Sequence, residues 1–152
     1  MFFPVKSETF ASPHSSSEVE QRMVDDINHQ DETKKKWFKG EITDRCFNIS
    51  LILKRPNNFT PIISGMIENE SNGKSLVIVK YELFPSTKRF LFFWTILTLL
   101  LTLFFAIPYQ AYLYGAITFS AGLVNYIITR ENFNIQVRKS RRALLKVVGA
   151  TE

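Results

Sequence analysis

The sequence predicts an α+β membrane protein, in which a four-stranded antiparallel β-meander precedes a two-helix transmembrane hairpin and a C-terminal amphipathic helix. Three observations lead to this fold class. Residues 90–129 form an apolar block without a charged side chain. Residues 37–83 alternate apolar and polar side chains with the period of β-strands. Residues 131–148 place apolar and basic side chains on opposite sides of a helix.

The N-terminal segment, residues 1–36, is mostly polar and is expected to be a mobile tail. Within it, Ser17-Glu18-Val19-Glu20 resembles a capping box at the start of a helix. Val19, Met23 and Ile27 follow at helical spacing. The segment therefore predicts one short, weak helix.

Residues 37–89 are expected to form a cytoplasmic β-domain. Strands are predicted at residues 37–43, 46–53, 61–69 and 74–83. The alternation is clearest in the second and fourth strands, for example at Phe47, Ile49 and Leu51. Asn72-Gly73 favours a turn because both residues tolerate positive φ. Short connections between successive strands predict an antiparallel meander.

Two membrane-spanning helices are predicted at residues 90–107 and 111–129. A helix rises about 1.5 Å per residue, so each segment covers roughly the thickness of the hydrocarbon core. Pro108, Tyr109 and Gln110 join them in an uncharged turn, whereas basic residues flank the opposite ends. The positive-inside rule then predicts a multi-pass protein of the inner membrane with both termini in the cytoplasm.

A stripe of small and polar side chains follows each predicted span. Such stripes allow close helix packing and hydrogen bonds between helices. We expect the two stripes to face each other, with a hydrogen bond from Asn125 to Thr95; the alternative is contact with another copy of the chain. The helix-packing residues are Thr95, Thr98, Thr102, Gly115, Thr118, Gly122 and Asn125.

Residues 130–152 predict a basic C-terminal helix. Its apolar side carries Phe133, Val137, Leu144 and Val148, and basic residues occupy the other side. The apolar side suits either the sheet or the bilayer surface, and the basic side suits anionic lipids of the inner leaflet. The sequence leaves these two placements open.

No group of residues in the sequence specifies a reaction. The acidic residues of the β-domain are scattered, and His14 and His29 lack neighbouring metal ligands. Cys46 is the single cysteine and is expected to be a small buried residue. We therefore expect no enzyme, no cofactor and no metal site. The basic residues flank the apolar block instead of forming a stripe, which argues against nucleic-acid binding.

A longer pattern consists of Phe38-x-Gly40, Phe47-x-Ile49 and Asn57-x-Phe59-x-Pro61-x-Ile63-x-Gly65-x-Ile67. Over residues 37–148 the chain thereby resembles a family of small bacterial two-span membrane proteins, known only as uncharacterised. The resemblance implies the same β-domain, membrane hairpin and short tail, and it implies no activity, cofactor or catalytic residue. The chain departs from the pattern at Asn58, where serine is expected, and in its long N-terminal tail.

The same pattern has a physical interpretation. Asn57 suits a turn, and Pro61 suits the first residue of a strand. Gly65 suits the close approach of an aromatic ring, for which Trp37 and Phe38 are the expected candidates. Loops carry function more often than strands do, so the connection is a candidate binding loop. It comprises Asn57, Asn58, Phe59 and Pro61.

The leading hypothesis is a non-catalytic, membrane-anchored interaction or assembly module. Its expected partners are a bilayer with anionic inner-leaflet lipids and either a second copy or another membrane protein. One alternative is a small oligomeric channel or transport subunit, suggested by the two stripes. A second alternative is an enzyme that acts on lipid head groups at the candidate loop, although the sequence supplies no acid–base pair for it.

Overall fold

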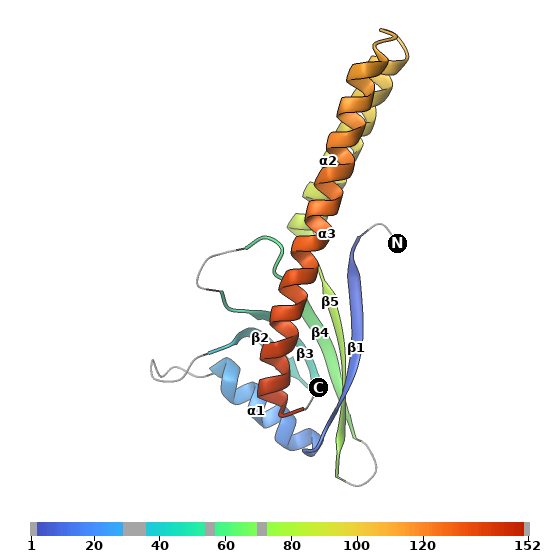
Figure 1. Ribbon diagram of the computed structural model, residues 1–152. Coiled ribbons are helices and arrows are strands. Elements are labelled where there is room, and N and C mark those ends of the chain that lie inside the picture. The colour runs from blue at the N-terminus through green and yellow to red at the C-terminus, as the bar shows by residue number, and fades with distance from the viewer. Residues whose placement is uncertain (1–2, 29–35, 54–56, 70–72, 151–152) are drawn as a thin grey trace.

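The computed structural model describes residues 3–28, 36–53, 57–69 and 73–150. A sheet lies at one end of the molecule, and two helices project away from it (Figure 1). The helices of the described residues are α1 (Ser16–Asn28), α2 (Pro85–Ala106) and α3 (Tyr112–Val148). The strands are β1 (Val5–Ser12), β2 (Phe38–Thr43), β3 (Cys46–Leu51), β4 (Ile62–Asn69) and β5 (Ser75–Glu82).

The strands that the structure describes form one five-stranded antiparallel sheet in the order β1-β5-β4-β3-β2. Successive strands from β2 to β5 are neighbours, as in a meander. The first strand instead pairs with the last, from Val5 opposite Glu82 to Ser12 opposite Ser75. The N-terminal segment therefore completes the sheet and makes β1 and β2 its two edges.

The predicted four-stranded meander is wrong, because residues 5–12 supply a fifth strand. Polar side chains led this segment to be interpreted as part of a mobile tail. Strand β1 alternates between a face that contacts the core, with Phe10 and Ser12, and an exposed face. An edge strand with so few apolar residues is difficult to recognise by hydrophobic alternation. Helix α1 covers the segment in which a weak helix was expected.

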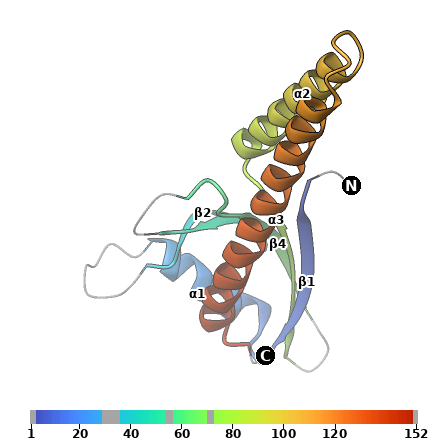
Figure 2. The ribbon, with the colours of Figure 1, turned by 45° about the horizontal axis from the view of Figure 1, so that its top comes forward.

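One face of the sheet is covered by α1 and by the C-terminal half of α3 (Figures 1 and 2). Side chains that alternate along the strands point toward these helices, as expected for a sheet with one buried face. The opposite face presents exposed residues such as Lys39, Asn48 and Met66. The largest core side chains include Phe38, Ile49, Ile63, Ile67, Tyr81, Phe133 and Leu144.

The second feature of the molecule is an apolar arm, which we define as α2 together with residues 112–129 of α3. The two segments run antiparallel and lie side by side (Figure 1). Proline at the first turn of α2 suits its start, since that position requires no backbone donor. At the tip, Gln110 has a positive φ of 50° and reverses the chain. Large apolar residues remain exposed along the whole arm.

The predicted two-helix transmembrane hairpin is also wrong. In the described part of the chain, α2 is the one helix that is long and apolar enough to cross a membrane. Tyrosines, glycines and Asn125 dilute the apolar character of residues 112–129. In addition, α3 continues without a break for 37 residues, so the predicted second span and the predicted C-terminal helix are one element.

The continuity of α3 decides where the basic tail lies. Phe133, Val137, Leu144 and Val148 are buried in the hydrophobic core against the sheet. Its basic side chains Lys139, Arg142 and Lys146 are exposed. Gly149 ends the helix in the left-handed conformation that glycine adopts readily. Of the two placements left open by the sequence, the structure therefore has the helix on the sheet.

Candidate functional site

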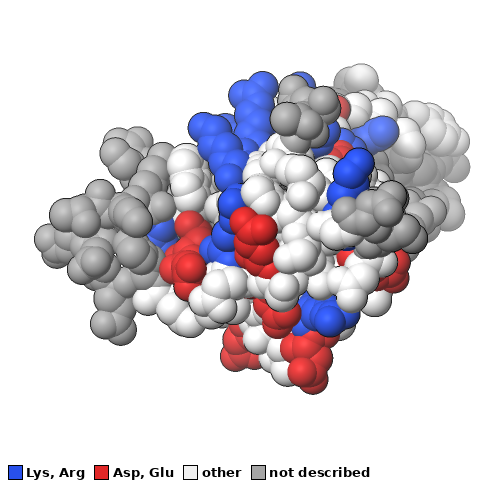
Figure 3. Space-filling view, turned by 90° about the horizontal axis from the view of Figure 1, so that it is seen from below, with Lys and Arg blue, Asp and Glu red and all other residues white. Residues whose placement is uncertain are grey.

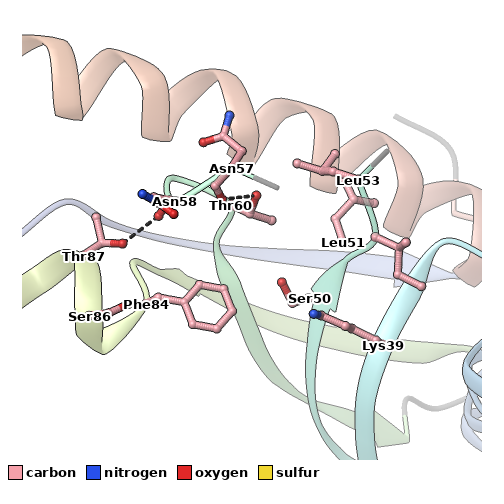
Figure 4. A pocket seen from close by; sticks show the side chains of 11 residues that line it. Lys39, Ser50, Leu51, Leu53, Asn57, Asn58, Thr60, Phe84, Ser86 and Thr87 are labelled. Carbon is pink, nitrogen blue, oxygen red and sulfur yellow. Dashed lines mark hydrogen bonds between the residues drawn. The ribbon is translucent and has the colours of Figure 1, made fainter. Parts of the chain in front are cut away.

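A cavity of about 290 Å³ lies where the sheet meets the base of the arm. We call it the junction pocket. Its walls come from strands β2 and β3, from the connection before β4 and from the first turn of α2 (Figure 4). The polar lining residues are Lys39, Ser50, Asn57, Asn58, Thr60, Ser86 and Thr87. The apolar lining residues are Leu51, Ile52, Leu53 and Phe84.

The loop at one side of the pocket is held by its own hydrogen bonds. The Asn57 side-chain oxygen accepts a bond from the Phe59 amide at 2.9 Å, which is an Asx-turn. The Asn57 carbonyl oxygen accepts bonds from both the amide and the hydroxyl of Thr60, at 3.1 and 2.8 Å. Hydrogen bonds to Asn57 therefore define the conformation of the loop on this side of the pocket.

Two further hydrogen bonds tie this loop to its surroundings. The buried hydroxyl of Thr87 donates to the Asn58 carbonyl oxygen at 2.7 Å and joins the loop to α2. The buried hydroxyl of Ser50 donates to the Pro61 carbonyl oxygen at 3.3 Å and joins it to β3. The pocket therefore keeps a fixed relation to the base of the arm.

The described lining of the pocket carries positive charge and no negative charge. Lys39 is the one charged residue among the described residues that line it, and no carboxylate lines it. Ion pairs form elsewhere at the base of the arm, where Glu82 accepts hydrogen bonds from Lys80 and Lys88. These bonds hold the pKa of Glu82 below its usual range. Lys39 makes no ion pair with a described residue, so its charge is available to a bound group.

The chemistry of the lining suits binding of a polar or anionic group. The donors that remain available are the Lys39 ammonium, the Ser86 hydroxyl and the two asparagine side-chain amides. Among its described lining residues there is no histidine, cysteine, aspartate or glutamate that could serve as a general base. Among the described residues there is also no group of three or more such side chains that could hold a metal ion.

The candidate loop predicted from the sequence contributes only part of this site. Asn57 and Asn58 line the pocket, whereas Phe59 and Pro61 do not. Sequence reasoning missed Lys39 and Ser50, which are direct cross-strand partners of β2 and β3. It also missed Ser86 and Thr87, because α2 begins before the apolar run. The strand register would have placed Lys39 beside Ser50, but it does not place either residue beside α2.

Five of the seven predicted helix-packing residues are in contact between the two segments of the arm: Thr98, Thr102, Gly115, Thr118 and Gly122. The hydroxyl oxygens of Thr102 and Thr118 are 3.0 Å apart. A Cβ atom at Gly122 would lie 2.6 Å from the hydroxyl oxygen of Thr98, so the glycine permits this contact. Gly115 is less tightly enclosed, since a Cβ atom there would lie 3.4 Å from the Thr102 carbonyl oxygen.

The expected hydrogen bond from Asn125 to Thr95 is absent from the described residues. The Thr95 hydroxyl donates instead to the Leu91 carbonyl oxygen of its own helix, at 2.8 Å. Backbone carbonyls one turn earlier are local acceptors that compete for threonine hydroxyls in membrane-type helices.

Two further sequence expectations are corrected by the structure. The aromatic ring over Gly65 belongs to Phe47, its cross-strand partner, and not to Trp37 or Phe38. A Cβ atom at position 65 would lie 2.5 Å from the Phe47 ring. Cys46, expected to be buried, is exposed, because it precedes the buried Phe47 in the alternation of β3.

Comparisons with known proteins found no matching family model, no matching curated protein and no matching solved structure. The resemblance to a two-span bacterial family therefore stays a prediction.

Proposed function

We propose that this protein is a non-catalytic, membrane-anchored interaction module, held at the inner membrane by helix α2. The observation that carries the proposal is the exposure of α2. Only 6% of its most apolar 18-residue stretch is buried within the molecule. The core helix of a water-soluble protein buries such a surface, whereas a helix in lipid leaves it exposed. Residues exposed by half or more include Phe90, Phe92, Phe93, Leu99 and Leu100.

The distribution of charge sets the proposed orientation. Lys88, Arg89 and Arg130 lie at the sheet end of the arm, and the tip at Tyr109 and Gln110 carries no charge. Basic residues are retained on the cytoplasmic side of a membrane. Because the arm doubles back at its tip, the sheet and both ends of the chain are proposed to lie together in the cytoplasm (Figure 1).

The proposed module offers a basic surface to an anionic partner. Seen from below, most lysine and arginine side chains lie in the upper half of the view and most acidic side chains in the lower half (Figure 3). Exposed basic residues follow α3 along its cytoplasmic half. Such a surface favours an acidic protein partner over a cationic one, because the unbroken α3 carries these residues about 12–24 Å beyond Arg130 and away from the arm. These residues are Arg138, Lys139, Arg142 and Lys146.

The channel alternative is not part of this proposal. The stripes of small and polar residues suggested it. Four residues of these stripes are in contact between α2 and α3: Thr98, Thr102, Thr118 and Gly122. Side chains that pack within one arm are not free to line a pore between copies.

Membrane anchoring is tested first by extraction. The protein should stay in the membrane pellet through an alkaline carbonate wash and should be released by detergent. Release by carbonate alone would overturn the proposal, because it would show peripheral attachment.

Orientation is tested with the exposed single cysteine, Cys46. A membrane-impermeant thiol reagent should label it in inverted vesicles and not in intact cells. A variant with Cys46→Ser and Tyr109→Cys should show the reverse, since Tyr109 lies at the tip. Labelling of Cys46 from outside would contradict the orientation.

The interaction role is tested separately by cross-linking in native membranes, followed by native mass measurement in mild detergent. A stable partner or second copy is the expected result. A strictly monomeric protein that co-purifies with nothing would contradict it.

A further inference from the structure

We propose that the junction pocket binds the head group of a net-anionic phospholipid, with the Lys39 ammonium against its phosphate. The inference rests on the proposed membrane anchoring and names the ligand of the candidate site. It is drawn from three properties of the pocket: its depth relative to the arm, its available donors and its mixed lining.

The depth of the pocket matches the head-group layer. Ser86 and Thr87 form one wall, and Phe90 begins the exposed apolar surface of α2. Three to four residues of helix separate them, which corresponds to about 4.5–6 Å. The head-group layer on each side of a bilayer is roughly 5–7 Å thick. A ligand in the pocket would therefore lie level with lipid phosphates when the arm is in the membrane.

Two donors in the pocket, the Lys39 ammonium and the Ser86 hydroxyl, remain available, whereas the hydroxyls of Ser50, Thr60 and Thr87 are engaged by loop carbonyls. Lys6, Lys80 and Lys88 each pair with a glutamate, whereas Lys39 pairs with none of the described residues. The exposed hydroxyl of Ser86 likewise makes no hydrogen bond to a described residue, and it opens on the same cavity. An ammonium and a hydroxyl with no competing carboxylate form a suitable environment for a phosphate group.

The lining is also amphipathic. Leu51, Leu53 and Phe84 contribute apolar surface beside the polar donors (Figure 4). A free phosphate has no group to contact this surface, but a phospholipid has the first carbons of its acyl chains. The combination therefore favours a lipid over a water-soluble phosphate compound.

The test measures which lipids the purified full-length protein retains in mild detergent. The protein is incubated with equal amounts of phosphatidylglycerol and phosphatidylcholine and examined by native mass spectrometry. Wild-type protein should retain phosphatidylglycerol preferentially. Lys39→Gln should weaken that retention about tenfold, the loss typical of a charge-assisted hydrogen bond. Lys74→Gln, an exposed lysine with the same charge change outside the pocket, should behave as wild type.

Several results would overturn the inference. Equal retention of phosphatidylglycerol by wild type and Lys39→Gln would exclude Lys39 from lipid binding. Equal losses in Lys39→Gln and Lys74→Gln would show a diffuse charge effect. Competition by soluble glycerol phosphate at the concentration of the lipid would indicate a site for free phosphate compounds.

The carbonate wash separates this inference from the function on which it rests. Lys39→Gln should remain in the membrane, because the arm is unchanged. Wild-type protein that is membrane-integral but shows no lipid preference defeats the pocket assignment alone. Wild-type protein released by carbonate defeats the anchoring as well.

Discussion

Tyr81 lies in the centre of the core on β5, and its hydroxyl has no hydrogen-bond partner among the described residues. Burial raises its pKa above the usual range, and the nearby Glu8 carboxylate acts in the same direction. A buried polar atom without a partner gives up hydration and gains no bond in return. The hydroxyl is therefore expected to contribute little to the stability of the sheet.

Tyr81→Phe should leave the free energy of unfolding unchanged or raise it slightly near pH 7. Because the pKa of Tyr81 is raised in the folded protein, its ionisation does not affect the free energy of unfolding below about pH 10, the pKa of an unfolded tyrosine. As the pH rises above that value, ionisation of the unfolded chain lowers the free energy of unfolding. The variant should therefore lose less stability than wild type in alkaline solution. Urea unfolding in detergent at neutral and alkaline pH checks both statements.

The matched control is Ser12→Ala. The Ser12 hydroxyl donates to the Val148 carbonyl oxygen at 3.0 Å inside the protein. Its removal leaves a buried acceptor unpaired and should cost about 1 kcal/mol at both pH values. A loss of similar size in Tyr81→Phe would show that its hydroxyl does have a partner.

At the scale of single residues, the sequence predicted types of contact better than partners. Asn57 was expected in a turn, and it does shape one through two acceptor atoms. Gly65 was expected under an aromatic ring, but the ring comes from Phe47. Local backbone needs can be inferred from residue type, whereas a tertiary partner depends on the register between strands.

At the scale of elements, the contact between α2 and α3 depends on one of two glycines in the same helix. A Cβ atom at Gly122 would clash with Thr98, whereas a Cβ atom at Gly115 would make ordinary van der Waals contacts. Gly122→Ala should therefore loosen the arm and lower its stability by about 1–3 kcal/mol, the usual cost of overpacking. Gly115→Ala should have little effect.

Thermal unfolding in detergent, followed by circular dichroism, measures this difference. Adding Thr98→Ala to Gly122→Ala should recover part of the loss, because the nearest clashing atom is removed. Equal effects of the two glycine substitutions would contradict the packing described for the arm.

The β-strands of the meander were predictable because hydrophobic alternation is a local property. Strand β1 was not, since it is an edge strand with polar side chains whose pairing partner lies far along the chain. Helix α3 was divided in error because its residues 112–129 and 130–148 face different surroundings. A change in composition along a chain marks a change of environment, and the backbone can continue through it.

At the scale of the whole molecule, β1 connects the sheet edge to α3. Glu8 accepts a hydrogen bond from Arg141 at 2.9 Å, and the Arg141 guanidinium lies 5.9 Å from the centre of the Phe10 ring. These contacts bring residues near both ends of the chain together. They make the N-terminal segment part of the fold, although its composition resembles that of a tail.

Deleting residues 1–12 should therefore destabilise the entire sheet domain. The deletion exposes the backbone of β5, a strand with buried Val77 and Val79, and unprotected apolar edges promote association between chains. We expect aggregation, visible as early elution in size-exclusion chromatography. Glu8→Gln keeps the strand and removes the two ion pairs of Glu8, with Lys6 and Arg141, so it should cost no more than about 2 kcal/mol. A deletion variant that elutes and unfolds like wild type would contradict this role.

The unbroken course of α3 has a mechanical consequence. Its 37 residues contain no proline and extend for about 55 Å, from the tip of the arm to the far end of the sheet. A rod without a joint transmits a tilt at one end as rotation of the other, so any tilt of the arm would turn the sheet through the same angle.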